Sequence, residues 1–387
     1  MNEAALLRRH YVDPEPFDPG ATEPVGAENE QFYRASSWKL MWWKFRRHKV
    51  AVASALLLLA FYLLVPFVEV IAPYNHTKRH GDFLHAPPQA VHIFHEGRLT
   101  RPFAYPYHFK FNLETFHRDY TVDRSQPLPI RFLCRGESYE FWGIWAADVH
   151  LVCPPENGTM FLLGTDRLGR DLLSRIIYGA RISLTIGIVG IAVSFALGLL
   201  FGGLAGYLGG WVDHLIQRVI EILRSLPELP LWLALSAALP ANWSPILVFF
   251  GITIILGLLD WPGLARAVRS KLMALREEDF VTAAELMGAS KRRIIARHLI
   301  PNFMSHLIAS ATLSIPSMIL GETALSFLGL GLRPPVTSWG VLLNEAQNLA
   351  ALQLHPWLIL PTVPVILVVL AFNFMGDGLR DAADPYH

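Results

Sequence analysis

The sequence of 387 residues is poor in charge and in cysteine. Charged side chains make up only 17% of it, against roughly 25% in an ordinary soluble domain, whereas 52% of its residues are hydrophobic. Two cysteines are too few for a disulfide-stapled miniprotein, and 28 Gly and 27 Pro are too few for a collagen-like chain. The formal net charge of +1 gives no overall attraction for nucleic acid. These absences leave a membrane protein with a substantial part in water.

The chain also lacks the motifs of nucleotide-binding and hydrolytic enzymes. None of its seven lysines follows a glycine, so the phosphate-cradling loop G-x-x-x-x-G-K-[ST] is missing. We find neither a dinucleotide-binding G-x-G-x-x-G between a strand and a helix nor a G-x-S-x-G nucleophile elbow. We therefore expect no catalytic residue, no cofactor bound by this chain and no ATP hydrolysis by it alone.

Hydropathy predicts an all-α membrane protein with six spans, because a span needs about 20 largely apolar residues. The first starts too deep in the chain for a cleavable signal peptide, and no small-residue cleavage site follows it. The third and fourth meet at a short turn that contains two prolines. The predicted spans are about 50–71, within 182–212, from near 214 to the turn at 240–245, from that turn to near 259, about 303–328 and about 356–375.

Four glycines mark one ridge of the second predicted span. Gly198, Gly202, Gly206 and Gly210 repeat every four residues, which places them on one side of a helix. Small residues on a ridge let two helices approach closely, so we expect a tight helix contact here rather than a ligand site.

Basic residues predict the orientation. Five Lys or Arg lie between Lys39 and Lys49, and eight lie in the loop 263–302, whereas the short loop 331–355 holds only Arg333. Short loops rich in Lys and Arg stay in the cytoplasm. We therefore expect a multi-pass protein of a bacterial inner membrane with both termini cytoplasmic.

The order of the segments predicts four parts. Residues 1–37 are polar, without apolar periodicity, and are expected to form a disordered cytoplasmic tail. Residues 38–71 hold the first span and its basic flank. Residues 72–163 form a periplasmic insert, whose short β-like runs predict some strands. Residues 164–387 form the core domain with the other five spans and the cytoplasmic loop at about 263–302.

The insert holds both cysteines and many histidines. Outside the cytoplasm the redox conditions favour disulfides, so Cys134 and Cys153 either form a disulfide or remain two unlinked thiols. Eight of the 15 histidines lie between His76 and His150, but their spacings match no standard metal-ligand pattern. We expect no metal site.

One carboxylate, Glu322, falls inside a predicted span. A charge in the bilayer is costly and usually faces a bundle interior or a wet cavity. Glu322 is therefore either a residue of a translocation path or gate, or a hydrogen-bonded structural residue near the outer interface.

The stretch from Glu278 to Asn302 predicts a helix, a sharp turn and a second helix in the cytoplasm. Gly288 is placed to stop the first helix, and Ser290 is placed to cap the second. Ala283 and Ala284 give the first helix a small-residue face suited to close contact with another protein. This stretch is either a docking device or a purely structural loop.

The same stretch resembles the EAA loop of the membrane subunits of bacterial ABC importers, E-A-A-x-x-x-G followed by nine residues and I-x-L-P. The residues that match are Ala283, Ala284, Gly288 and Pro301. The departures are Thr282 for Glu, His298 for Ile and Ile300 for Leu.

Further motifs resemble the dipeptide/oligopeptide/nickel importer permeases, C-type subunit. They are Gly164-Thr-Asp-Arg-Leu-Gly-Arg-Asp171 with the helix after it, Leu325-Ser-Phe-Leu-Gly-Leu-Gly331, Ser338-Trp-Gly340 and Gly376-Asp-Gly-Leu-Arg-Asp381 with the residues after it. The resemblance covers about 38–72 and 160–387 and says little about the insert.

The resemblance implies the type I ABC importer permease fold, and it implies a docking role for the loop. It assigns ATPase docking to Thr282, Ala283, Ala284, Glu285, Gly288, Ala289, Ser290, Arg292 and Arg293. It implies a second homologous permease subunit, two ATP-binding subunits that use ATP and Mg²⁺, a periplasmic solute-binding protein and membrane lipids as partners. The implied function is import of di- and oligopeptides by alternating access.

Two alternatives remain at this stage. The same machinery could carry oligosaccharides, opines or nickel, because the binding protein does most of the selecting in such importers. The chain could also be a stand-alone membrane enzyme or receptor with a functional external domain, for which the histidine-rich insert is the motive.

Overall fold

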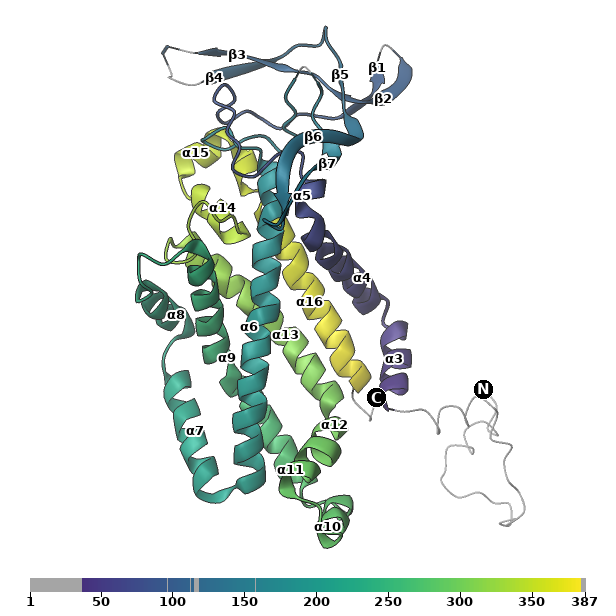
Figure 1. Ribbon diagram of the computed structural model, residues 1–387, viewed down its shortest axis with the longest axis vertical. Coiled ribbons are helices and arrows are strands. Elements are labelled where there is room, and N and C mark those ends of the chain that lie inside the picture. Colours follow the sequence, from purple (N-terminus) through teal and green to yellow (C-terminus); the bar gives the residue numbers. More distant parts are fainter. Residues whose placement is uncertain (1–36, 96, 112, 115–117, 157, 384–387) are drawn as a thin grey trace, which may run out of the picture.

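The structure is a computed structural model that describes residues 37–95, 97–111, 113–114, 118–156 and 158–383. Figure 1 shows a bundle of long helices with a group of small β-sheets at one end of it. Element labels are those of Figure 1. The predicted N-terminal tail lies outside the described residues, apart from its last residue.

Five helices in the described part of the chain are long and apolar enough to cross a membrane. They are Lys49–Ile71 (α4 Lys49–Leu64, a 3-10 turn Val65–Phe67 and α5 Val68–Ile71), α6 Leu172–Leu208, α9 Pro245–Leu275, α13 Met304–Phe327 and Pro356–Ala383, which ends in α16 Thr362–Ala383. The shorter helices are α3 Ser37–Arg47, α7 Gly210–Ser225, α8 Glu228–Ala237, α10 Asp279–Leu286, α11 Lys291–Ile294, α12 Ile300–Asn302, α14 Trp339–Glu345 and α15 Leu349–Leu354.

The third predicted span is broken. Leu226 has an extended backbone with ψ 141°, and Pro227 precedes α8, so the segment divides into α7 of 16 residues and α8 of 10 residues. The ring of a proline disfavours the helical conformation of the residue before it. Neither half reaches the about 20 residues that a span needs. The span predicted from near 214 to the turn at 240–245 is therefore formed by two helices and not by one continuous helix.

The glycine ridge brings α6 and α9 into close contact. A Cβ atom at Gly202 would lie 2.5 Å from the Ala265 carbonyl oxygen, and one at Gly206 would lie 2.8 Å from that of Arg269. Gly198 is equally close to Leu264. The prediction of a tight helix contact is confirmed for these three glycines and wrong for Gly210, because α6 ends at Leu208 and Gly210 opens α7.

The insert folds into three small antiparallel sheets. The first has the order β1-β2-β5, the second pairs β3 with β4, and the third pairs β6 with β7. Their bounds are β1 His92–His95, β2 Arg98–Ala104, β3 Tyr107–Phe111, β4 Arg118–Val122, β5 Leu128–Pro129, β6 Arg131–Phe141 and β7 Trp145–Cys153. Strands occur in the insert, as predicted.

A disulfide ties β6 to β7. It joins Cys134 to Cys153, whose Cα atoms lie 6.4 Å apart. In the register of this hairpin, Arg131 is opposite Cys153 and Cys134 is opposite His150. Of the two alternatives left open by the sequence, the structure contains the bonded one.

The bundle has two distinct ends. Figure 1 shows the sheets, α14 and α15 at one end, which we call the β end. It shows α3, α10 to α12 and the C-terminal part of α16 at the other end, which we call the α10 end. Each end therefore gathers segments that are far apart in the sequence.

Candidate functional site

The loop at the α10 end forms the predicted helix, turn and helix. The helix α10 ends at Leu286, and Gly288 follows with φ +76°, a left-handed conformation that glycine adopts at little cost. The Ala289 amide donates to the Ala284 carbonyl at 3.0 Å and closes the turn. α11 begins directly after Ser290, whose carbonyl accepts from Ile294.

One face of α10 is buried in the protein itself. Val281 and Ala284, which are 1% and 3% exposed, pack with Ile294 into an apolar cluster with α9. Residues 281 and 284 share the inward face of the helix, so Ala284 packs in the protein's own core, and its assignment to docking stays a prediction. Ala283 lies one position earlier and is exposed.

α10 and the residue after it also expose large apolar side chains. Leu286 is 85% exposed, Met287 81% and Phe280 40%. Large apolar side chains that are exposed close together are typical of surfaces that another protein covers. Among the other residues assigned to docking, Ala289 is half-buried, and the exposed ones are Thr282, Glu285, Gly288, Ser290 and Arg293. The side chains of Arg292 and His298 lie outside the described residues.

Rigid connections tie the loop to the bundle. α9 runs without a break to Leu275, so the loop starts about one turn of chain before α10 and not near residue 263. The Tyr207 hydroxyl at the end of α6 donates to Glu285 Oε1 at 3.2 Å. After α11 the chain continues as a π-helical segment, Ile295–Leu299, and bends at Phe303 before α13. α10 is therefore connected to α6 by a hydrogen bond and to α9 and α13 by apolar packing.

Glu322 is fully buried near the β end of α13. Its Oε1 accepts from the Ser326 hydroxyl at 2.8 Å and the Ser338 hydroxyl at 2.6 Å, and its Oε2 accepts from Ser183 at 3.3 Å. Buried polar groups require such partners, so the contacts fit the structural interpretation of Glu322. Its role in a path or gate stays a prediction.

The contacts of Glu322 join three of the sequence motifs. Ser183 comes from α6, Ser326 from α13 and Ser338 from the residue before α14. The Ser183 hydroxyl also accepts from the Trp339 amide at 3.1 Å, and Trp339 itself is fully buried. The motifs that are separate in the sequence thus form one buried polar centre.

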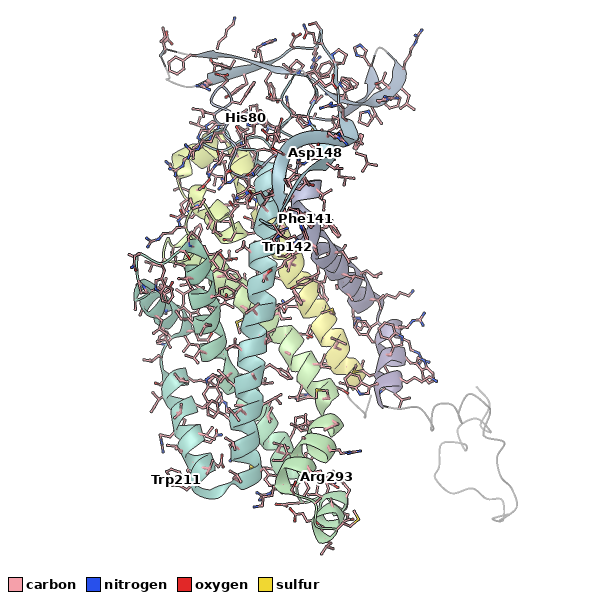
Figure 2. All side chains as sticks on the ribbon, in the orientation of Figure 1. His80, Phe141, Trp142, Asp148, Trp211 and Arg293 are labelled. Carbon is pink, nitrogen blue, oxygen red and sulfur yellow. A yellow bond between two sulfur atoms is a disulfide. The ribbon has the colours of Figure 1, made fainter. Side chains whose placement is uncertain are left out.

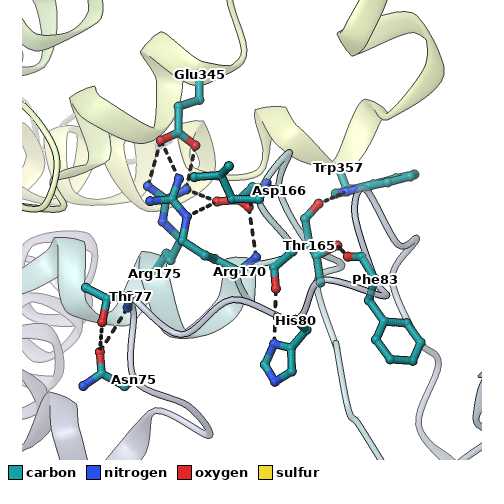
Figure 3. A network of polar contacts seen from close by, with 12 residues as sticks. Asn75, Thr77, His80, Phe83, Thr165, Asp166, Arg170, Arg175, Glu345 and Trp357 are labelled. Atoms are coloured by element: carbon teal, nitrogen blue, oxygen red, sulfur yellow. Dashed lines mark hydrogen bonds and ion pairs between the residues drawn. The ribbon is translucent and has the colours of Figure 1, made fainter. Parts of the chain in front are cut away.

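A buried ion network lies at the β end (Figure 3). Asp166 accepts from Arg170 Nε at 2.6 Å and from Arg175 Nη1 at 2.5 Å. Glu345, at the end of α14, accepts from both arginines at 2.6 to 2.9 Å. Because the side chain of Arg175 is 1% exposed, this network fixes α14 to the start of α6.

The loop before α6 also holds the insert. The Thr165 hydroxyl donates to the Phe83 carbonyl at 2.5 Å, and the Trp357 indole donates to the Thr165 carbonyl at 3.0 Å. A Cβ atom at Gly169 would lie 2.1 Å from the His80 carbonyl oxygen, so only glycine fits there. Figure 3 shows these contacts around Asp166. We call residues 164–175, with the residues they bind, the β-end junction.

Charge and burial shift two pKa values in this junction. Burial alone would raise the pKa of Glu345, but the hydrogen bonds and charges of Arg175 and Arg170 outweigh it and hold that pKa below its usual value. Burial, with a smaller contribution from the charge of Arg175, lowers the pKa of His76 to about 4. At neutral pH, Glu345 is therefore ionised and His76 is neutral.

Sequence reasoning missed the role of Glu345. The motif that contains Asp166, Arg170 and Arg175 carries two buried arginines but only one carboxylate that reaches both. Two buried arginines with one shared carboxylate indicate that a second acidic partner is needed, but that partner lies 170 residues away along the chain.

Within the described residues, no group of three or more His, Cys, Asp or Glu has a geometry that could hold a metal ion.

The geometry so far defines a multi-pass membrane protein with a rigid helical loop at one end and a closed polar junction at the other. Two family models match the chain. The binding-protein-dependent transport system inner membrane component matches residues 198–386, and the N-terminal TM domain of oligopeptide transport permease C matches residues 36–88.

Known proteins are similar over the core of the chain. The oligopeptide transport system permease protein OppC of Haemophilus influenzae is 43% identical over 223 residues, which are 57% of this chain and 69% of that protein. The dipeptide transport system permease protein DppC of Bacillus subtilis is 40% identical over 233 residues, 60% of this chain and 70% of that protein. A solved structure of the MetNI methionine ABC transporter in inward-facing conformations aligns with 18% identity and a TM-score of 0.43, over 54% of this chain and 96% of the other.

The chain belongs to the family of binding-protein-dependent transport system inner membrane components, in its dipeptide and oligopeptide ABC permease branch. It is a transport subunit and not itself an enzyme, and ATP hydrolysis in such transporters belongs to a separate subunit. The family implies a complex with an ATPase and a binding protein.

Proposed function

We propose that this chain is the membrane-spanning subunit through which an ATP-driven importer moves di- and oligopeptides into the cytoplasm. The observation that carries the proposal is the 43% identity to an oligopeptide permease and the 40% identity to a dipeptide permease over the core of the chain. These two relatives carry peptides by name, and neither similarity depends on the insert.

The complete transporter in this proposal has five chains. This permease pairs with a second, homologous permease, two ATP-binding subunits use ATP and Mg²⁺, and a periplasmic binding protein delivers the peptide. The basic residues of 39–49 and 263–302 support a location in the bacterial inner membrane with both termini and the α10 end in the cytoplasm. The β end then faces the periplasm.

The α10 loop is the lever of this mechanism. Leu286 and Met287 present an apolar surface to an ATPase, while the buried Val281 connects the other side of α10 to α9. When two ATPases close, α10 moves with them, and its packing transmits the movement to the long helices. Rigid-body rotation of the bundles then switches the path between its inward-open and outward-open states.

Uptake of labelled solutes tests the cargo. The gene is deleted from its host and restored on a plasmid, and uptake of a labelled dipeptide and a labelled pentapeptide is measured with unlabelled oligosaccharide, opine or Ni²⁺ as competitor. We expect uptake of at least one peptide to be lost on deletion, restored by the plasmid and unaffected by the competitors. Unchanged peptide uptake, with loss of uptake of another solute, overturns the peptide proposal.

A further inference from the structure

The β6–β7 hairpin ends in an exposed apolar turn. Residues 141–145, which we call the hairpin tip, connect Phe141 at the end of β6 to Trp145 at the start of β7. The Ile144 amide donates to the Phe141 carbonyl at 3.1 Å. Ile144 is 69% exposed and Trp145 is 65% exposed. Large apolar side chains of this kind are unfavourable in water unless another surface covers them.

The hairpin tip is held in one position. Trp142 has φ +54°, a left-handed conformation that bulky residues rarely adopt. Its indole Nε1 donates to the Pro66 carbonyl at 3.1 Å, and the guanidinium of Arg181 lies 4.3 Å from the centre of its ring. A strained residue persists only where the surroundings fix it. The contacts with Pro66 and Arg181 therefore fix the position of the tip relative to α4 and α6.

The depth of the tip follows from these contacts. The first span begins at Lys49, and Pro66 is 17 residues further along it. At a helical rise of about 1.5 Å per residue, Pro66 lies about 26 Å from the start of the span. The hydrocarbon core of a bilayer is about 30 Å thick. Arg181, the last charge before the uncharged run 182–212, pairs with Glu69 at 2.5 Å beside the tip. The hairpin tip thus lies where the hydrocarbon ends at the β end, and Figure 2 shows Phe141 and Trp142 at this level.

The apolar surface of the first span continues onto the tip. In the apolar stretch of this span, 17% of the residues are buried inside the protein, which is the lowest share of the five spans. In the other four spans this share is 33% to 39%. Its exposed residues Leu63, Leu64 and Phe67 lead toward the tip, where the Phe67 and Phe141 rings are 6.4 Å apart. Tryptophan is enriched at the boundary between hydrocarbon and headgroups, because its ring is apolar and its N–H is polar.

We propose that the hairpin tip inserts into the headgroup boundary of the bilayer and anchors the insert to the membrane surface. The partner is a lipid surface, and the side chains of Ile144 and Trp145 provide the contact. The disulfide between Cys134 and Cys153 ties the two strands of this hairpin to each other. The proposal depends on the membrane position of the first span and not on the solute that is carried.

Spin labels at three exposed positions test this anchor. Ile144→Cys, Val149→Cys and Leu99→Cys are each labelled with a nitroxide in the complex purified from its host and reconstituted in lipid nanodiscs. Val149 lies on the same side of β7 as Trp145, four residues away from the tip, and Leu99 is a 73% exposed residue of β2. The protein without an added cysteine controls for labelling of the disulfide.

Power saturation by oxygen and by a water-soluble nickel chelate then gives the depth of each label. We expect the label at 144 to be several-fold more accessible to oxygen than to nickel, the label at 99 to show the reverse, and the label at 149 to lie between them. Nickel accessibility at 144 equal to that at 99 overturns the proposal, because the tip then faces water. Protection of 144 from both reagents also overturns it, because a protein then covers the tip.

Discussion

The two ends of the bundle differ in how their contacts are completed. At the β end, Asp166, Arg170, Arg175 and Glu345 bind one another, and their charges are hidden from solvent. At the α10 end, the apolar side chains of Leu286 and Met287 have no cover within the described part of the chain. The ion network at the β end is completed by the chain's own residues, whereas the apolar side chains at the α10 end leave a surface that a partner can cover.

The largest effect is expected from Glu345→Ala at the β end. This substitution leaves the buried guanidinium of Arg175 with Asp166 as its remaining carboxylate partner. Breaking a buried ion pair lowers the free energy of unfolding by on the order of 3–5 kcal/mol. Thermal unfolding of the purified protein measures this loss. The matched control is Glu277→Ala at the α10 end, whose pair with Arg276 at 3.5 Å is exposed. An equal loss in both variants would contradict the contrast between the ends.

A pH effect is expected at the β end, where burial lowers the pKa of His76 to about 4, below the ordinary 6.5. The unfolded chain binds this proton as the pH falls through 6.5, while the folded protein does not until about 4. Stability is therefore lost between these values, by about 2 kcal/mol at pH 5 relative to neutral pH.

The variant His76→Asn isolates this contribution. The other titrating groups of the junction are shared with the parent protein, so they cancel in the difference. We expect the free energy of unfolding of the parent to fall more steeply from pH 7 to pH 5 than that of the variant, with equilibrium unfolding in detergent as the measurement. Parallel pH profiles would show that His76 takes up its proton equally in both states.

Leu286→Asp tests the open surface of the α10 end. The side chain is 85% exposed, so we expect unchanged stability, but a charge at the contact with an ATPase should lower uptake by at least tenfold, or about 1.4 kcal/mol of coupling. Uptake by cells and co-purification of the ATPase are measured together. Leu113→Asp, at a 77% exposed position of the insert, is the control. Normal uptake by the Leu286 variant would exclude this face from docking.

An effect confined to the backbone is expected at the turn after α10. Gly288 has φ +76° and open space around it, so a larger side chain is strained only by the backbone. Gly288→Val should cost on the order of 1–2 kcal/mol and reduce uptake, whereas Gly288→Asn should cost less, because asparagine tolerates the left-handed conformation. Equal uptake by the two variants would indicate that the geometry of this turn does not affect coupling.

Much of the helical architecture could be predicted because it depends on local composition. Long apolar runs predicted the five continuous spans, and the spacing of Gly198, Gly202 and Gly206 predicted the α6–α9 contact. The break at Leu226 and Pro227 falls at a proline between Arg224 and Glu228, and a hydropathy average over a whole span does not resolve it. The inward side of α10 was not predictable, because a short helix with apolar residues on two sides needs its neighbours to select one.

The sequence by itself determined that this protein spans a membrane, that a helix, a turn and a second helix follow α9, and that the phosphate-cradling pattern G-x-x-x-x-G-K-[ST] is missing. Those properties depend on residues close together in the chain. Only the tertiary structure decided that Glu345 completes the arginine network, that Glu322 is bound by three serines and that Trp142 lies beside the first span. The partners in each of these contacts are far apart in sequence, and their distances are fixed only when the helices pack.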